Sequence, residues 1–155
     1  MNVTGPKKLL LCLLATLGIS CGSKTPKPVL PEGRLLSYSY SRYGTMAEPD
    51  ESYLLERKDD NSLRVECRTY RDTVDLTLTG AKADAVCEAI SNIVKEEKVY
   101  KFKPQYKTKF QVMDGWSWSM AIKFEDTVIT SGGSNAGPNS SALSQIHEYL
   151  LSLQE

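Results

Sequence analysis

The sequence predicts an α+β protein, with an antiparallel sheet of about five to six strands and two helices packed on one face. Two changes of periodicity support this fold class. Between residues 36 and 79, apolar and polar side chains alternate, which is typical of strands with one buried face. After Gly80, and again after residue 140, apolar side chains recur at helical spacing. Strands and helices are therefore segregated along the chain, and this order favours an antiparallel sheet.

Four strands are expected in the first half of the domain, which begins near Arg34. The apolar residues of the first strand alternate with serines and are Leu36, Tyr38 and Tyr40. The other three strands alternate in the same way over residues 52–57, 63–69 and 74–79. Polar residues between these runs indicate turns.

The second half begins with a helix over residues 81–97, whose apolar face includes Ala83, Val86, Cys87, Ile90, Ile93 and Val94. A basic and aromatic stretch follows, in which Pro104 interrupts regular structure. A hairpin is then expected from a strand over residues 116–124 and a short strand over residues 127–131. A glycine-rich loop over residues 131–138 leads to a last helix, which Asn139 or Ser140 can cap. The core face of that helix is expected to be Leu143, Ile146, Leu150 and Leu153.

The first 21 residues have the pattern of an export signal. Lys7 and Lys8 precede an apolar run of eleven residues, Leu9 to Ile19, and Cys21 follows. A membrane-spanning helix needs about 20 apolar residues, so the run fits a cleaved secretory signal better. The segment resembles the signal peptide of a bacterial lipoprotein, with Gly18 where that family usually has leucine.

The resemblance implies that Cys21 is acylated and that it becomes the first residue of the mature protein. In the family, Gly22 in place of aspartate implies sorting to the outer membrane, facing the periplasm. The alternative is cleavage by an ordinary signal peptidase, because Gly18 and Ser20 are both small. That cleavage would leave a soluble periplasmic or secreted protein.

The predicted organisation is a signal peptide over residues 1–20, a lipidated cysteine and proline-rich tether over 21–33, and one domain over 34–155. Removal of the signal would leave 17 basic and 19 acidic residues, and this balance argues against a nucleic-acid partner. Only Cys67 and Cys87 would remain inside the domain. They are expected either to form a disulfide in an oxidising compartment or to be two separately buried thiols.

The C-terminal block resembles a recurring motif of small uncharacterised bacterial proteins. The motif consists of a tryptophan strand beginning at Trp118, a hairpin, a loop of serine, glycine, asparagine and proline over residues 131–138, and a closing helix. The resemblance covers about 40 residues and implies no activity.

Several residues are candidates for a site. His147 is the only histidine, so a Ser-His-Asp catalytic set would have to use it, although packing beside the apolar face is the simpler interpretation. The loop could hold an anion on its backbone N–H groups or could simply need positive φ; its candidates are Ser131, Gly132, Gly133, Ser134 and Asn135. A ligand surface is also suggested by Trp116, which could stack on a sugar or peptide, and by Lys101, Lys103 and Lys107. No pattern indicates a metal or a cofactor.

Two functions follow from these observations. The first is a membrane-anchored, non-catalytic binding module of the cell envelope, held by acylated Cys21 and contacting an envelope protein or a glycan. The alternative is a small envelope hydrolase with His147 and residues 131–139 in its site.

Overall fold

The computed structural model describes residues 27–45, 48–110, 112 and 115–154. The strands are β1 (Leu35–Tyr43), β2 (Glu51–Arg57), β3 (Leu63–Arg68), β4 (Thr73–Leu78), β5 (Tyr106–Lys107), β6 (Ser117–Phe124) and β7 (Val128–Ser134). The helices are α1 (Gly80–Glu96) and α2 (Ala142–Leu151), with short 3₁₀ turns η1 (Val99–Lys101) and η2 (Ser152–Gln154). No helix in these ranges is long and apolar enough to cross a membrane.

The α+β class is confirmed, but the sheet is larger than expected and is mixed. Within the described ranges it has seven strands, in the order β4-β3-β2-β1-β6-β7-β5. Six strands pair antiparallel, whereas β5 pairs parallel to β7 through only two residue pairs. The expectation of a purely antiparallel sheet was therefore wrong at one edge. The chain returns from α1 and runs beside β7 in the direction of that strand.

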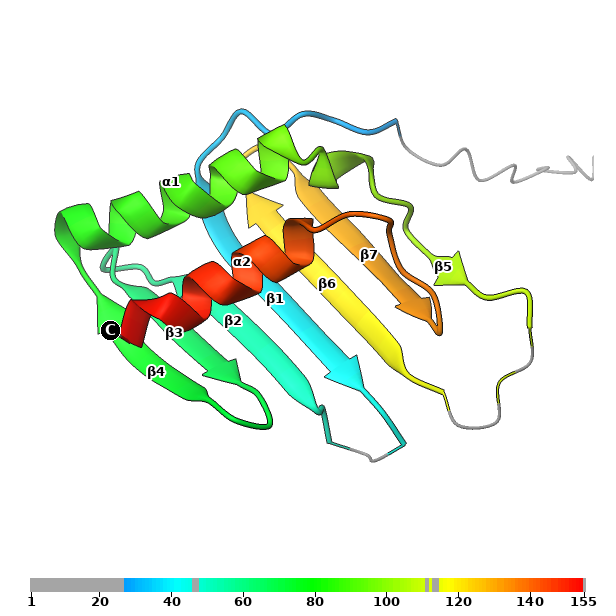
Figure 1. The fold of residues 1–155 in the computed structure, drawn as a ribbon. Coiled ribbons are helices and arrows are strands. Elements are labelled where there is room, and N and C mark those ends of the chain that lie inside the picture. The colour runs from blue at the N-terminus through cyan, green and yellow to red at the C-terminus, as the bar shows by residue number, and fades with distance from the viewer. Residues whose placement is uncertain (1–26, 46–47, 111, 113–114, 155) are drawn as a thin grey trace, which may run out of the picture.

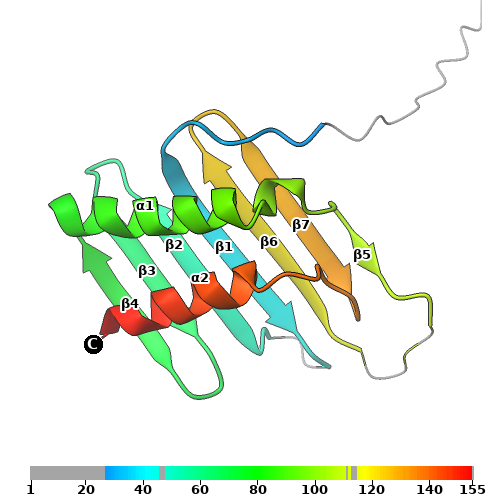
Figure 2. The same cartoon turned by 45° about the horizontal axis from the view of Figure 1, so that its top comes forward.

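Both helices lie side by side across one face of the sheet, and the other face is open (Figure 1; Figure 2). The covered face contains the core, in which Tyr38, Leu55, Ile122 and Phe124 are at most 2% exposed. Burial follows the period of two along β2, β3 and β6, and in β6 every second residue is buried. Ala83, Val86, Cys87, Ile90 and Val94 of α1 are buried as expected, and so is Ser91.

The first strand differs from its predicted register at its start. Leu35 is 1% exposed, whereas Leu36, which was expected to face the core, is only half-buried. The pairing of β1 with β6 shifts between Leu35 and Ser37, so one extra residue lies in β1 there. Such a bulge changes which side chain faces the core, and the alternation of Tyr38 and Tyr40 does not reveal it.

The glycine-rich loop was expected to begin at Ser131, but Ser131–Ser134 form the end of β7. The two glycines there are required by close packing rather than by positive φ. A Cβ on Gly133 would lie 2.3 Å from the Ala136 carbonyl oxygen and 2.7 Å from Trp118 Nε1. The residue with positive φ in this region is Asn135, at 50°. The strand therefore continues because only glycine leaves room for the Trp118 indole and the returning chain.

This packing predicts a large difference between two glycine substitutions. Gly133→Ala should lower the free energy of unfolding by about 1–3 kcal/mol, because the nearest atom to the new methyl group belongs to the backbone. Gly137→Ala is the matched control, since its Cβ would meet Trp118 Nε1 at an ordinary 3.8 Å. Urea unfolding measures both variants. Equal midpoints for the two would contradict the packing.

Candidate functional site

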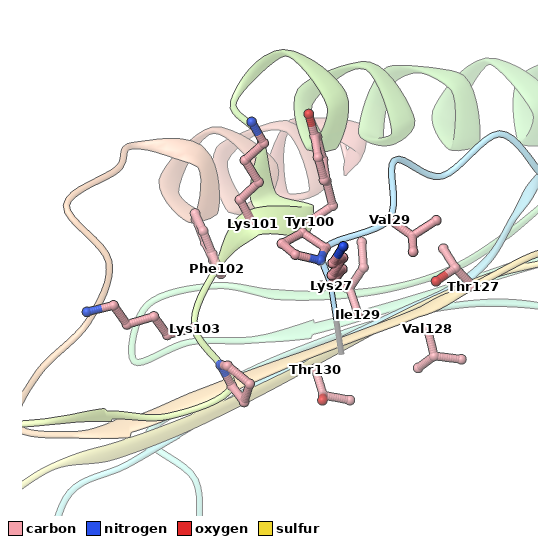
Figure 3. Close-up of a pocket in the computed structure, with 12 residues that line it drawn as sticks. Lys27, Val29, Tyr100, Lys101, Phe102, Lys103, Thr127, Val128, Ile129 and Thr130 are labelled. Carbon is pink, nitrogen blue, oxygen red and sulfur yellow. The ribbon is translucent and has the colours of Figure 1, made fainter. Parts of the chain in front are cut away.

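A pocket of about 470 Å³ opens at the outer edge of β7, and we call it the tether-side pocket (Figure 3). Three segments line it. They are residues 27–29, residues 100–104 after α1, and residues 127–130 at the start of β7. Its volume is within the range of small-ligand and peptide sites. The first of these segments belongs to the stretch that was expected to be the tether.

The tether-side pocket contains an unpaired length of strand edge. Phe124 N donates to Thr127 O at 2.8 Å, and Asn135 N donates to Trp116 O at 2.9 Å. Residues opposite each other in an antiparallel ladder alternate between hydrogen-bonded and non-hydrogen-bonded pairs. The backbone groups of Ile129 and Ser131 therefore point to β6, whereas those of Val128 and Thr130 point outward.

The outward backbone groups of β7 differ along the strand in whether they have a hydrogen-bond partner. β5 pairs with Gly133 and Ser134, at the far end of β7. Within the described ranges, no backbone hydrogen bond joins Val128 or Thr130 to a neighbouring segment on the outer side. The N–H and C=O groups of these two residues therefore face the tether-side pocket.

The wall formed by residues 100–104 is held in place by specific bonds. Ser131 Oγ donates a 2.7 Å hydrogen bond to Lys103 O. Lys103 N donates to the phenolic oxygen of Tyr106 at 3.1 Å. The ammonium of Lys101 lies 5.7 Å from the centre of the Tyr100 ring. The wall is thus fixed against β7 near Ser131.

The charge of the tether-side pocket has one sign. Among the described residues, its lining includes Lys27, Lys101 and Lys103 and contains no aspartate or glutamate. Apolar surface is also exposed there, since Val29 and Val128 are 57% and 59% exposed. Figure 3 shows Tyr100, Lys101 and Phe102 on the helix side of the sheet, and Val128 and Thr130 on the opposite side. A ligand at this edge would meet cations and apolar side chains together.

The structure brings only some of the predicted surface residues together. Lys101 and Lys103 line the tether-side pocket, but Lys107 lies on β5 and Trp116 just before β6, outside the lining. Trp116 is partly buried and receives the Arg42 guanidinium over its ring at 5.1 Å. The backbone N–H of Trp116 donates to Asn135 Oδ1 at 2.8 Å, so Asn135 has a structural partner. The ring and the backbone N–H of Trp116 therefore both have partners within the chain.

The expected anion site on residues 131–135 has no support in the geometry. Ser131, Gly132, Gly133 and Ser134 are strand residues, and their backbone groups belong to the ladders with β6 and β5. The helix that follows starts only at Ala142, where Ser140 Oγ accepts a 3.1 Å bond from the backbone. The N-cap residue is Ser141, and it makes no side-chain cap bond, so the expectation of Asn139 or Ser140 as the cap was wrong.

His147 is enclosed by tyrosines. Its ring stacks on Tyr53, with centroids 3.8 Å apart and planes 3° apart, and it shares a 2.8 Å hydrogen bond between Nε2 and Tyr38 Oη. No serine or carboxylate bonds to it among the residues that the structure describes. Burial lowers the pKa of His147 to about 3, so the ring is neutral at ordinary pH. These contacts attach α2 to the sheet and give the hydrolase hypothesis no support.

Cys67 and Cys87 are both buried and both free, which is the second of the two expected alternatives. Cys87 Sγ accepts a 3.3 Å hydrogen bond from Arg57 Nη2, which also contacts Asp84 at 3.0 Å. Arg57, which bonds to Cys87, pairs with Leu63 of β3. Cys67 lies four residues from Leu63 along the same strand, a separation of about 13 Å. Burial also raises the pKa of the Cys67 thiol to about 11, as expected for a packing residue.

Part of the site lies outside the sequence prediction. Residues 127–130 were assigned to a short strand, and residues 27–29 to the tether, without any suggestion that they meet. The sequence gives no local signal for this contact, because Pro26, Pro28 and Pro31 are typical of an extended linker. In the structure Pro31 is buried, and Glu32 N donates to Asp126 Oδ2 at 2.8 Å, so this stretch lies against the domain.

Signal peptide and lipidation at Cys21 lie outside the described residues. A comparison with protein-family models and one with curated proteins found no match for this chain.

The environment of His147 predicts how stability changes with pH. Its pKa is about 3 when folded and about 6.5 when unfolded, so the unfolded chain binds the extra proton between these values. Acidification from pH 8 to pH 5 should therefore lower the free energy of unfolding by about 1–2 kcal/mol through this group. Urea unfolding at the two pH values measures the change.

His147→Phe is the control, because phenylalanine can keep the stack on Tyr53 but does not titrate. Its stability should depend less on pH over the same interval. As His147 is the only histidine, its proton resonance can be followed directly. A titration midpoint near 6.5 would contradict the buried, neutral ring.

Proposed function

We propose that this protein is an exported, lipid-anchored binding module of the bacterial cell envelope, without catalysis, and that the tether-side pocket is its ligand site. The observation that carries the proposal is the combination of three lysines, exposed apolar side chains and open backbone groups in one pocket. Such a mixture suits recognition of an anionic partner.

The position of the pocket supports the link between anchor and binding. Lys27 lines the pocket and lies six positions after Cys21 in the sequence. An extended chain advances about 3.3–3.6 Å per residue, so the pocket would lie within about 20 Å of an acylated cysteine. The ligand would therefore be met close to the membrane surface, in the periplasm if the sorting suggested by Gly22 holds.

A non-catalytic role is preferred because the described residues that line the pocket include no histidine, cysteine, aspartate or glutamate. Lysine could serve as a base only with a lowered pKa. The pocket therefore offers binding groups, both cationic and apolar, rather than a catalytic set.

The anchor is tested by changing the cysteine expected to carry it. Cys21→Ser should move the protein from the membrane fraction to the soluble fraction and stop lipoprotein processing, because the acylated sulfur would be lost. Cys12→Ser, within the apolar run, is the matched control and should leave fractionation unchanged. Continued membrane binding of Cys21→Ser with unchanged processing would contradict the anchor.

The ligand site is tested by photo-crosslinking of the full chain in cells. A benzoylphenylalanine at Val128, which is 59% exposed, should give a defined crosslinked product. The same group at Tyr70, 96% exposed in the turn between β3 and β4, should not. The product should decrease about tenfold in Lys101→Glu/Lys103→Glu, since ion contacts would become repulsive.

Arg71→Glu/Lys82→Glu makes the same change of charge at exposed positions outside the pocket and should leave the product intact. Crosslinking from Tyr70 alone, or a product that is equally abundant in both double variants, would overturn the assignment of the pocket.

A further inference from the structure

We infer that the tether-side pocket binds an extended, acidic segment of a polypeptide, which adds a strand to the outer edge of β7. This inference rests on the proposed function, because it names the partner of the same site.

The outward backbone groups of Val128 and Thr130 can form hydrogen bonds with an added strand. Two residues with outward N–H and C=O groups present four hydrogen-bonding positions along one line, and these positions face the pocket. A peptide in extended conformation can bond to such groups, as strands do when they add to a sheet edge. β5 already pairs in this way at Gly133 and Ser134. The added strand would lie in line with β5, beside the part of β7 with which β5 does not pair.

The side chains of an added strand would find contacts on both faces of the sheet at this edge. Side chains of an added strand would alternate between the helix side and the open side of the sheet. On the helix side they would meet Tyr100, Phe102 and the exposed Val29, and on the open side Val128 and Thr130 (Figure 3). Both sides offer apolar contact. A segment with valine or a similar residue at alternate positions would therefore fit.

The positive charge of the pocket determines the charge of the ligand that it would bind. Lys27, Lys101 and Lys103 line the pocket without an acidic residue among them. Carboxylates of the ligand would be attracted to these ammonium groups, whereas a basic segment would be repelled. The opposite sheet edge, β4, has Asp75 at an exposed outward position and lacks lysine within the strand. An acidic strand would therefore choose β7 over β4.

The test measures binding of a fluorescein-labelled hexapeptide of alternating Glu and Val to the full chain. Thr130→Pro removes the outward N–H and leaves the bonds to β6 in place, because proline is tolerated at such positions of an edge strand. We expect this variant to weaken binding at least about tenfold. Thr77→Pro is the matched control. The Thr69 N to Asp72 O bond places Thr77 in the outward set of β4, and both threonines are exposed.

A second probe separates strand pairing from charge alone. The same hexapeptide with every amide N-methylated keeps its carboxylates but loses its backbone donors, and it should bind at least about tenfold more weakly. Circular dichroism and urea midpoints check that Thr130→Pro is folded. If it is not, the comparison of the two peptides on the unmodified protein still decides the question.

Equal binding of the methylated and unmethylated probes would overturn strand addition while leaving the proposed function in place. Binding of phosphatidylglycerol vesicles that depends on Lys101 and Lys103, with no binding of either peptide, would assign the pocket to lipid headgroups and overturn the inference. Crosslinking from Tyr70 alone, or a Val128 product that is equally abundant in both double charge variants, would instead overturn the proposed function itself.

Discussion

The close packing of Trp118 on Gly133 is the contact on which the candidate site depends. Trp118 Nε1 donates a 2.9 Å bond to Ala136 O, which draws the chain after β7 back over the end of the strand. A Cβ at Gly133 would also lie 3.0 Å from Tyr106 Cβ, so β5 meets β7 at the same residue. Pairing with β5 therefore occurs at this end of β7. The other end, at Val128 and Thr130, is left with open backbone groups and becomes part of a pocket.

An open strand edge is normally a hazard, because any other strand can pair with it. In this protein three lysines line the pocket at the edge, and their positive charge disfavours pairing with the same edge of a second copy and with basic segments. The same ammonium groups attract a segment that carries carboxylates. One set of charges would thus discourage self-association and select the ligand. The covered face of the sheet contributes a fixed frame, since Tyr53 and Tyr38 hold His147 and with it α2.

Most elements of the fold could be predicted from the sequence, because their signals are local. The alternation of β1 to β4 and of β6 and the helical spacing of α1 each report burial of one face. Tyr106 and Lys107 give no such signal, since a strand of two residues has no period and Pro104 lies just before it. The extension of β7 through Gly132 and Gly133 was also missed, because its cause is a contact with Trp118, which is distant in sequence.

The site was predictable only in part, for the same reason. The basic and aromatic character of Lys101 and Lys103 is visible in the sequence, but the open edge depends on strand order and on which backbone groups point outward. Hydrogen exchange of backbone amides, followed by NMR, measures this directly. The amides of Val128 and Thr130 should exchange about tenfold or more faster than those of Ile129 and Ser131, and should slow when the acidic hexapeptide is added. Equal protection of all four amides in the free protein would contradict the open edge.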